Sequence, residues 1–504
     1  MTTPPPPRPL LFTDAKFLLP SGTYAQRLLI VDGRIAAVDP RDGELPLKTQ
    51  RAALGNVWYT PGLDDAHLHL FWIGEQLLRQ ADLSHSAAIG EVLARLSDHG
   101  GRHKKGWLLG RGFDHERLSE KRLPTRAELD TVSSTRPIVV TRVCGHLGVI
   151  NSAALALVPP ALAARGNAET GVFVESALWD VLKEVPPLTE AQLEEAALLA
   201  MNLARSRGFT AVGTMLEEPR QWWALRRLAD SGRMPIRVVA HLPGPAIREL
   251  ADAGLKTGHG DDRLRAGYAK FFSDGTFGAR TAWLHQPYSD APGETGNALL
   301  SAAEMTRIFR DTQALGFDIA VHAIGDAAND ACITAIQACP RPARQRIEHT
   351  SLCSDTALDR IAAAGIVAVV QPQFSRSDAW LDQRLGPARV RNTYRFASML
   401  RRGIPLALSS DSPVERLDPA PCLAAATGGC PWHDERLSPL QALTAYTAGS
   451  AFAGRVEAVR GSIAPGQLAD FTVFPFDPLT ATPEAFGALK AIETLTVSPH
   501  PPVA

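Results

Sequence analysis

Thr60-Pro-Gly-Leu-Asp-Asp-Ala-His-Leu-His-Leu70 is the most informative segment of this 504-residue sequence. It is predicted to form the end of a short buried strand. Side chains alternate along a strand, so His67 and His69 are expected to point to the same side. Two neutral imidazoles with an acid close by suit a zinc-type cation. An isolated His-x-His pair is equally consistent with two hydrogen-bonded structural histidines, so the rest of the chain must discriminate.

The middle of the chain repeats a strand followed by a helix. This rhythm is typical of parallel βα units, and eight such units form a TIM (β/α)8 barrel. The expected helical patterns include 303–315, between two of the strands, and 440–453, after the last strand. We predict the eight strands at the His67 segment, 209–215, 236–242, 268–272, 318–322, 346–349, 366–370 and 405–409. The fold class is therefore predicted to be α/β.

Two departures from a plain barrel are expected. About 140 residues, 71–208, separate the first two strands, which is far longer than an ordinary loop and predicts an inserted subdomain. Both ends of the chain are β-rich. We predict that 8–60 and 456–497 together form a small composite β-sandwich, while 61–455 form the barrel domain.

The composition excludes several classes of partner. The formal net charge is −1, and no long basic run favours nucleic acid or an anionic membrane. The first residues lack the pattern of a signal peptide, and no apolar run approaches the about 20 residues that span a bilayer. Six cysteines occur without a C-x-x-C spacing, so a thiolate zinc site is not expected. We expect a cytoplasmic protein that acts on a small molecule.

Four further polar residues lie at or just past the carboxyl ends of predicted strands, where such barrels carry their active sites. They are Lys270, His322, His349 and Asp411. Each alone has an ordinary structural explanation: a hydrogen-bonded histidine, a lysine that points to solvent, or an aspartate that caps a helix. Together with the His-x-His pair, however, they share one rim of one barrel. This combination favours a metal site.

Motifs along nearly the whole chain resemble the amidohydrolase superfamily of metal-dependent hydrolases. More narrowly, they resemble amidohydrolase family 3, the YtcJ-like group that includes N-substituted formamide deformylase. The motifs are Pro61-Gly-Leu-Asp-Asp-Ala-His-Leu-His69, Leu123-Pro-Thr-Arg-Ala-Glu-Leu-Asp130, Gly145-His146, Lys270-Phe-Phe-Ser-Asp-Gly275, Val321-His-Ala-Ile-Gly-Asp326, Glu348-His349, Ser410-Asp411 and Gly461-Ser-Ile-Ala-Pro-Gly-Gln-Leu-Ala-Asp470.

The resemblance implies a ligand set for one or two divalent ions, with zinc expected. His67 and His69 would hold the first ion. Lys270 matches a lysine that many relatives carbamylate to bridge two metals, and His322 and His349 would hold the second ion. A free ammonium group cannot ligate a cation, so Lys270 joins the site only as a carbamate. The number of metals and the state of this lysine stay open at this point.

The implied chemistry is hydrolysis of a carbon–nitrogen bond, of the amide or N-formyl type, by a metal-activated hydroxide. Asp411 would contact the metal and the hydroxide, take its proton and pass it to the leaving nitrogen. His146 matches a family position near the substrate and would stabilise the developing oxyanion. An alternative for His146 is a purely structural link between the insertion and the barrel.

Further side chains are candidates for the pocket and for supporting the ligands. Asp114, Arg280 and Trp283 are expected to contact substrate, although Arg280 has the alternative of a salt bridge to Asp274. A ligand histidine needs its second ring nitrogen held. Three acids can do this, namely Asp65, Asp326 and Glu348. Alternatively, Asp65 caps a turn and Glu348 pairs with Arg346.

Two other functions compete with this hypothesis. A one-metal deaminase of a heterocyclic substrate would use the same barrel, but it needs no bridging lysine. A catalytically inactive barrel scaffold would have lost ligands, and here none is missing. Relatives are often dimers, so a homodimer is a possible state. The number of bound metal ions would distinguish the one-metal deaminase from the expected hydrolase. Metal analysis of the purified protein would distinguish the inactive scaffold from both enzymes.

Overall fold

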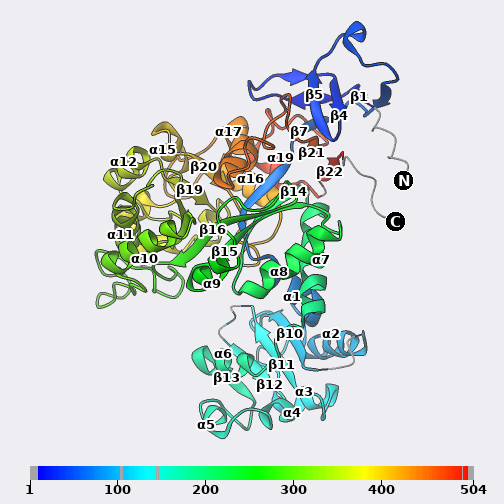
Figure 1. Ribbon diagram of the computed structural model, residues 1–504. Helices are drawn as coiled ribbons and strands as arrows, with labels where there is room; N and C mark the ends of the chain where they lie inside the picture. The colour runs from blue at the N-terminus through cyan, green and yellow to red at the C-terminus, as the bar shows by residue number, and fades with distance from the viewer. Residues whose placement is uncertain (1–8, 103–105, 144, 146, 491, 498–504) are drawn as a thin grey trace. The chain divides into compact units, whose positions relative to one another are not determined.

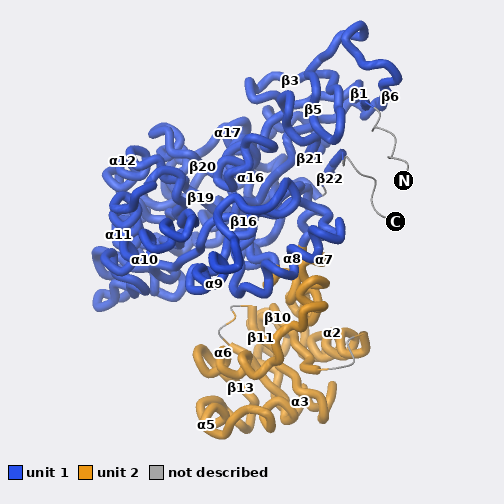
Figure 2. Tube along the Cα trace, in the orientation of Figure 1, with its two compact units in different colours: residues 1–70, 201–504 blue, residues 71–200 orange. Residues whose placement is uncertain are grey.

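The computed structural model describes residues 9–102, 106–143, 145, 147–490 and 492–497. It divides into two compact units (Figure 2). One unit, called here the barrel unit, comprises Met1–Leu70 and Met201–Ala504. The other, the inserted unit, comprises Phe71–Ala200. None of the described helices combines the length and the apolar character needed to cross a membrane.

An eight-stranded parallel sheet forms the centre of the barrel unit (Figure 1). Its strands are almost wholly buried, as expected of a parallel sheet that is covered by helices. In spatial order they are β8 (Leu63–Leu68), β14 (Phe209–Met215), β15 (Arg237–Pro243), β16 (Leu264–Phe272), β17 (Ile319–Ala323), β18 (Arg346–His349), β19 (Val367–Val370) and β20 (Leu406–Leu408). Each strand pairs in parallel with the next.

The first and last strands approach each other just beyond β20. The backbone N–H of Asp411 donates to the carbonyl of His67 at 2.8 Å. The N–H of Ser410 donates to the carboxylate of Asp65 at 3.0 Å. These bonds join the two edges of the sheet, which is nearly closed. The predicted TIM barrel is therefore confirmed, with all eight strands within a few residues of their predicted positions.

Helices follow the strands and cover the sheet (Figure 1). α10 shows the usual start signal, a capping box in which Ser301 and Glu304 satisfy each other's backbone N–H groups. The predicted helix at 440–453 contains a π-turn, η4 (Ala445–Gly449). The helices of this unit are α8 (Pro219–Asp230), α9 (Ile247–Asp252), α10 (Ala302–Ala314), α11 (Asp326–Gln337), α12 (Asp355–Ala364), α13 (Phe374–Ser377), α14 (Leu381–Arg389), α15 (Phe396–Arg401), α16 (Pro419–Gly428), α17 (Pro439–Thr444), α18 (Ser450–Ala453) and α19 (Pro483–Gly487), with short 3-10 turns η1 (Asp42–Glu44), η2 (Gly244–Ala246) and η3 (Val390–Asn392).

Two small sheets, one of them built from both ends of the chain, confirm the predicted sandwich. The rings of Phe17, Tyr59 and Phe471 pack together between them, with centroids 5.1–6.3 Å apart. One sheet contains β5 (Arg34–Val38), β4 (Leu28–Val31), β1 (Leu10–Thr13) and β6 (Gln50–Ala53). The other contains β22 (Glu493–Thr496), β21 (Asp470–Phe474), β7 (Trp58–Pro61), β2 (Lys16–Leu18) and β3 (Tyr24–Ala25).

The inserted unit has its own five-stranded sheet, with apolar clusters built on its strands. The chain enters this unit through α1 (Leu70–Arg79) and leaves it through α7 (Glu190–Ser206). The sheet order is β13 (Val172–Val174), β12 (Leu147–Ile150), β11 (Ile138–Arg142), β10 (Leu108–Phe113) and β9 (Gln80–Asp82). Its helices are α2 (Ile89–Arg102), α3 (Arg126–Val132), α4 (Ser152–Leu155), α5 (Pro160–Ala163) and α6 (Glu175–Lys183).

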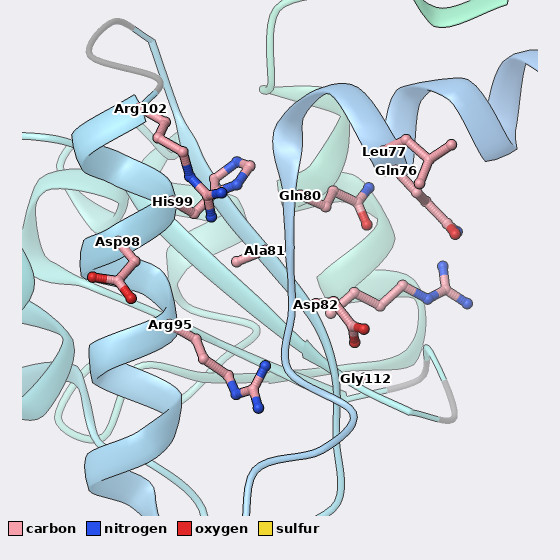
Figure 3. Close-up of a pocket in the computed structure, with 11 residues that line it drawn as sticks. Gln76, Leu77, Gln80, Ala81, Asp82, Arg95, Asp98, His99, Arg102 and Gly112 are labelled. Carbon is pink, nitrogen blue, oxygen red and sulfur yellow. The ribbon is translucent and has the colours of Figure 1, made fainter. Parts of the chain in front are cut away.

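An open cleft of about 670 Å³ lies within the inserted unit (Figure 3). Arginine and histidine side chains from α2 line it, together with residues of α1 and β9. Its polar lining includes Arg95, His99, Arg102, Gln80 and Asp82. None of the residues predicted to bind metal or substrate lines this cleft. The candidate site has to be sought at the barrel.

Candidate metal centre

His67, His69 and Asp411 converge at the carboxyl ends of β8 and β20. Asp411 Oδ1 lies 3.3 Å from Nε2 of His67 and 3.3 Å from Nε2 of His69. His67 and Asp411 are buried, and His69 is partly buried. The alternation of strand side chains brings the two imidazoles to one side, as predicted. These three groups can each offer one ligand atom to a single ion.

Neighbouring carboxylates hold the outer nitrogen of each imidazole. His67 Nδ1 lies 2.6 Å from Glu348 Oε2, and His69 Nδ1 lies 3.1 Å from Glu217 Oε1. A carboxylate accepts only, so Nδ1 of each neutral ring must carry the proton. The lone pair is then on Nε2, the atom that faces Asp411. This is the arrangement that a metal-ligating histidine requires.

The three groups fit a divalent cation. Asp411 Oδ1 is buried, yet it forms no hydrogen bond of acceptable geometry with a described residue. Two ligands bound at about 2.1 Å with a tetrahedral angle are separated by roughly 3.4 Å, close to the observed spacing. Burial disfavours the charged form of His69, but the neighbouring carboxylates of Asp411 and Glu217 outweigh it and raise the His69 pKa to about 9. The electrostatic field here therefore favours a positive charge.

His322 and His349 extend this group across β17 and β18. Their ring centroids are 4.4 Å apart, and the ring of His349 is 5.2 Å from that of His67. His322 Nε2 lies 2.9 Å from the carbonyl oxygen of Gly275, and His349 Nδ1 lies 2.8 Å from Gln371 Oε1. Nδ1 of His322 and Nε2 of His349 are then the nitrogens available as ligands. Burial lowers the pKa of both rings, that of His349 to about 4, so both are neutral at pH 7.

Lys270 is buried in β16 and forms no ion pair with a described residue. Its Nζ lies 4.1 Å from the centroid of the Phe272 ring and 3.5 Å from the carbonyl oxygen of Phe271. Burial lowers the pKa of Lys270 to about 8. A neutral amine is thus accessible near physiological pH, and only the neutral amine is a nucleophile toward carbon dioxide.

The backbone is strained where two of these strands end. His349, Thr350 and Asp411 have φ angles of 74°, 48° and 56°. Residues other than glycine rarely adopt this left-handed conformation, and such strain concentrates at functional sites. Here it places the side chains of His349 and Asp411 beside the other candidate ligands.

Glu348 is the supporting acid that contacts a candidate ligand directly. Arg346 donates to both of its oxygens, from Nε at 2.8 Å and from Nη2 at 3.0 Å. Arg346 and His67 therefore share this buried carboxylate. Asp65 differs: within the described chain its hydrogen bonds come from the backbone N–H groups of His67 and Ser410 and not from an imidazole nitrogen. Burial raises the pKa of Asp65 to about 7.

Among the described residues, the hydrogen bonds of Asp326 are to backbone donors and not to a candidate ligand histidine. Its Oδ1 accepts the backbone N–H groups of His285 and Ala327 at the start of α11. The carboxylate near His322 is instead Asp274, whose Oδ1 lies 3.4 Å from His322 Nε2. Asp274 also accepts N–H groups from residues at the loop after β16 and at the end of β17.

The predicted pocket residues are placed as follows. Arg280 pairs with Asp290 at 2.8 Å, whereas Asp274 accepts backbone N–H groups. Trp283 is partly buried, and its backbone N–H donates to Asp274. Asp114 lies in the inserted unit, where it pairs with Arg142 at 2.7 Å. His146 lies outside the described residues.

Sequence reasoning missed Glu217, Gln371 and Asp274. Glu217 lies two residues beyond β14, and Gln371 directly follows β19. Both positions are at the carboxyl end of a strand, which was the signal available for them. Asp274 lies within the lysine motif, where it was considered only as a partner of Arg280. Its burial between two loops could not be read from the motif.

The chain is similar to known proteins along most of its length. Residues 54–496 match the model of the amidohydrolase family. The chain is 29% identical to the putative amidohydrolase YtcJ of Bacillus subtilis over 89% of both chains. It is 26% identical to N-substituted formamide deformylase of Arthrobacter pascens, over 94% of this chain and 93% of the relative.

A solved structure is similar along the same length. It is an uncharacterized metal-dependent hydrolase from Pyrococcus furiosus, 30% identical, with a TM-score of 0.84 over 94% of this chain and all of the other. The resemblance predicted from the motifs is thereby confirmed. The chain belongs to the amidohydrolase family of metal-dependent hydrolases, and it is an enzyme that acts on carbon–nitrogen bonds.

Proposed function

We propose that this enzyme hydrolyses an amide or N-formyl bond in a small molecule. The observation that carries the proposal is the convergence of His67, His69 and Asp411, in which the buried Asp411 Oδ1 lies 3.3 Å from both imidazoles and has no hydrogen-bond partner of good geometry among the described residues. The name of the Arthrobacter relative, N-substituted formamide deformylase, supports the N-formyl class. The similarity between this chain and that relative covers nearly the whole of both sequences.

Zinc is the metal that the donor set favours. Two imidazole nitrogens and one carboxylate oxygen form a usual catalytic zinc set, which leaves a position open for water or substrate. When bound there, such a cation lowers the pKa of water toward about 7 and polarises a carbonyl oxygen. His67, His69 and Asp411 would hold this ion. Glu348 and Glu217 would keep the two imidazoles oriented through Nδ1.

We assign the transfer of the water proton to Asp411. Its pKa is held well below the usual range, because its interactions with His67 and His69 outweigh the effect of burial. It is therefore an anion at neutral pH and can accept a proton from the attacking water. Hydrolysis forms a bond between the carbonyl carbon and the water oxygen and breaks the bond to nitrogen. The proton held on Asp411 then goes to the departing amine, so the charges balance.

Lys270, His322 and His349 would complete a second cation site. Lys270 would serve as a carbamate, formed when its neutral amine adds carbon dioxide and releases one proton. Its burial and the absence of an ion pair with any described carboxylate support this role. Nδ1 of His322 and Nε2 of His349 would supply the nitrogen ligands. A second ion with a bridging group distinguishes this proposal from a one-metal deaminase.

A substrate screen with matched compounds tests the proposed function. The zinc-loaded protein would be incubated with N-formyl, N-acyl and cyclic amides, and released amine would be quantified together with formate or the other acid. We expect equal amounts of amine and acid from at least one amide class. Release of ammonia from a heterocyclic amine, without hydrolysis of any amide, would contradict the proposal. Asp411→Asn is the control, since it should release neither product.

A further inference from the structure

Four rings form a continuous row along the carboxyl ends of four consecutive strands. The row is Phe272 on β16, His322 on β17, His349 on β18 and Phe374 at the start of α13, after β19. Neighbouring ring centroids are 5.6, 4.4 and 6.2 Å apart. Phe272 is paired in register with His322, which explains why their side chains lie on the same side.

Phe272 occupies the layer directly above Lys270. The two residues are separated by one position in β16, so strand alternation points both side chains to the same face. Lys270 is 3% exposed, whereas Phe272 is 47% exposed. The Phe272 ring thus covers the buried amine of Lys270 with one face, and the other face of the ring is open. A large open aromatic surface beside ligand histidines is unusual for a position selected only for packing.

A second exposed apolar residue is joined through its backbone to the residue next to Phe272. Leu299 is 58% exposed, and its backbone N–H donates to the carbonyl oxygen of Ser273, the residue that follows Phe272, at 2.9 Å. Phe374 stacks on His349 with an interplanar angle of 23° and is partly buried. Apolar surface therefore flanks both histidines at the rim of the barrel. We call Phe272, Phe374 and Leu299 the apolar wall.

We propose that the apolar wall binds an uncharged apolar substituent of the substrate, ring-bearing or branched, next to the carbon–nitrogen bond. This inference rests on the proposed function for the position of that bond. Aromatic rings recognise other rings by offset or edge-to-face contact, and removing both from water favours binding. The substrates would therefore be amides with a bulky apolar group, and small or charged amides would bind poorly.

Binding of a matched pair of probes tests this without requiring turnover. N-(2-phenylethyl)methanesulfonamide and N-methylmethanesulfonamide carry the same polar head, which has no carbonyl to hydrolyse. Their dissociation constants would be measured on the zinc-loaded protein by calorimetry. We expect the phenylethyl probe to bind at least tenfold more tightly. Phe272→Ala and Phe374→Ala should each reduce this ratio at least threefold, and Phe272→Leu should retain most of it.

A control and two contrary results complete the test. Trp223→Ala removes a ring that is 39% exposed on the outer helix α8, and it should leave the ratio unchanged. Equal binding of the two probes to the unmodified protein would overturn the inference. So would an equal loss for both probes in Phe272→Ala, because the ring would then only support His322 and Lys270. The probes are not hydrolysed, so the two proposals can fail separately. If the ratio of the two dissociation constants is as expected but the protein hydrolyses no amide, the proposed function is contradicted and the binding role of the apolar wall is retained.

Discussion

Glu348 and His67 form a buried contact of 2.6 Å between Oε2 and Nδ1. Arg346 holds the same carboxylate from the other side through Nε and Nη2. Both side chains of this contact are almost completely inaccessible to solvent. The contact thus fixes the tautomer of His67, and the strand that supplies His349 also supplies the group that orients His67.

Glu348→Gln tests this orientation. The amide can present either an acceptor or a donor to His67 and carries no charge for Arg346, so we expect about 10–100-fold weaker zinc binding. Competition with a chelator of known affinity would measure it. Glu217→Gln is the matched control: its carboxylate is about half exposed, and the loss should be smaller. A larger effect at Glu217 than at Glu348 would contradict the orienting role of the buried carboxylate.

Asp411→Asn distinguishes a role of Asp411 in proton transfer from a role in folding. The amide cannot accept the proton of an attacking water, so we expect kcat to fall about 10²–10⁴-fold. Bound zinc should be retained through the histidines. Steady-state kinetics and metal analysis of the same preparation would measure both. Full activity in this variant would remove the role assigned to Asp411.

Lys270→Met tests the bridging carbamate. Methionine fills a similar volume but cannot form a carbamate, so we expect the zinc content to fall from two ions to one per chain. The pKa of Lys270 lies near 8, lowered by burial, and the neutral fraction therefore rises between pH 7 and 9. Reloading metal-free protein with zinc and bicarbonate should be faster at pH 9 than at pH 7. Two ions in the variant, or a rate independent of pH, would contradict the carbamate.

Asp378 should make stability depend on pH. Burial raises its pKa to about 6, although Tyr394 donates a hydrogen bond to it at 2.5 Å. An unfolded aspartate titrates near 3.9, so between pH 4 and 6 the unfolded state releases its proton first. Stability attributable to this group is therefore lost as the pH rises through that window, and the loss is complete above the folded pKa.

Asp378→Asn removes this titration. We expect the apparent Tm of the variant, relative to the unmodified protein, to rise between pH 4 and 6.5 by roughly 1–3 °C. Differential scanning fluorimetry across this range would show it. Asp382→Asn changes a neighbouring exposed aspartate and should produce no such trend. A constant difference between Asp378→Asn and the unmodified protein at every pH would contradict the linkage.

The barrel and the candidate ligands were largely predictable from the sequence. Buried strands leave short apolar runs, and the polar residue that ends a run marks the catalytic rim, as His349 does after β18. Helix starts were also readable, because capping residues such as Ser301 act locally. The π-turn at Ala445–Gly449 was not, since its bulge depends on packing and leaves the sequence pattern helical.

The groups that support the ligands were less predictable. Glu217, just beyond β14, contacts His69, and Gln371, just beyond β19, contacts His349. Such pairs depend on the side-chain geometry of distant segments. Asp326 shows the same dependence: its motif neighbours a candidate ligand in sequence, but at the start of α11 its carboxylate accepts backbone N–H groups. Local motifs identify residues, whereas their partners follow from the folded structure.

A crystal structure of the zinc-loaded enzyme, with anomalous diffraction recorded at the zinc edge, is the most direct test of the metal centre. The account predicts an anomalous peak about 2.1 Å from Nε2 of both His67 and His69 and within ligating reach of Asp411. A peak located only elsewhere, for example in the cleft of the inserted unit, or no peak in protein that hydrolyses amides, would contradict it.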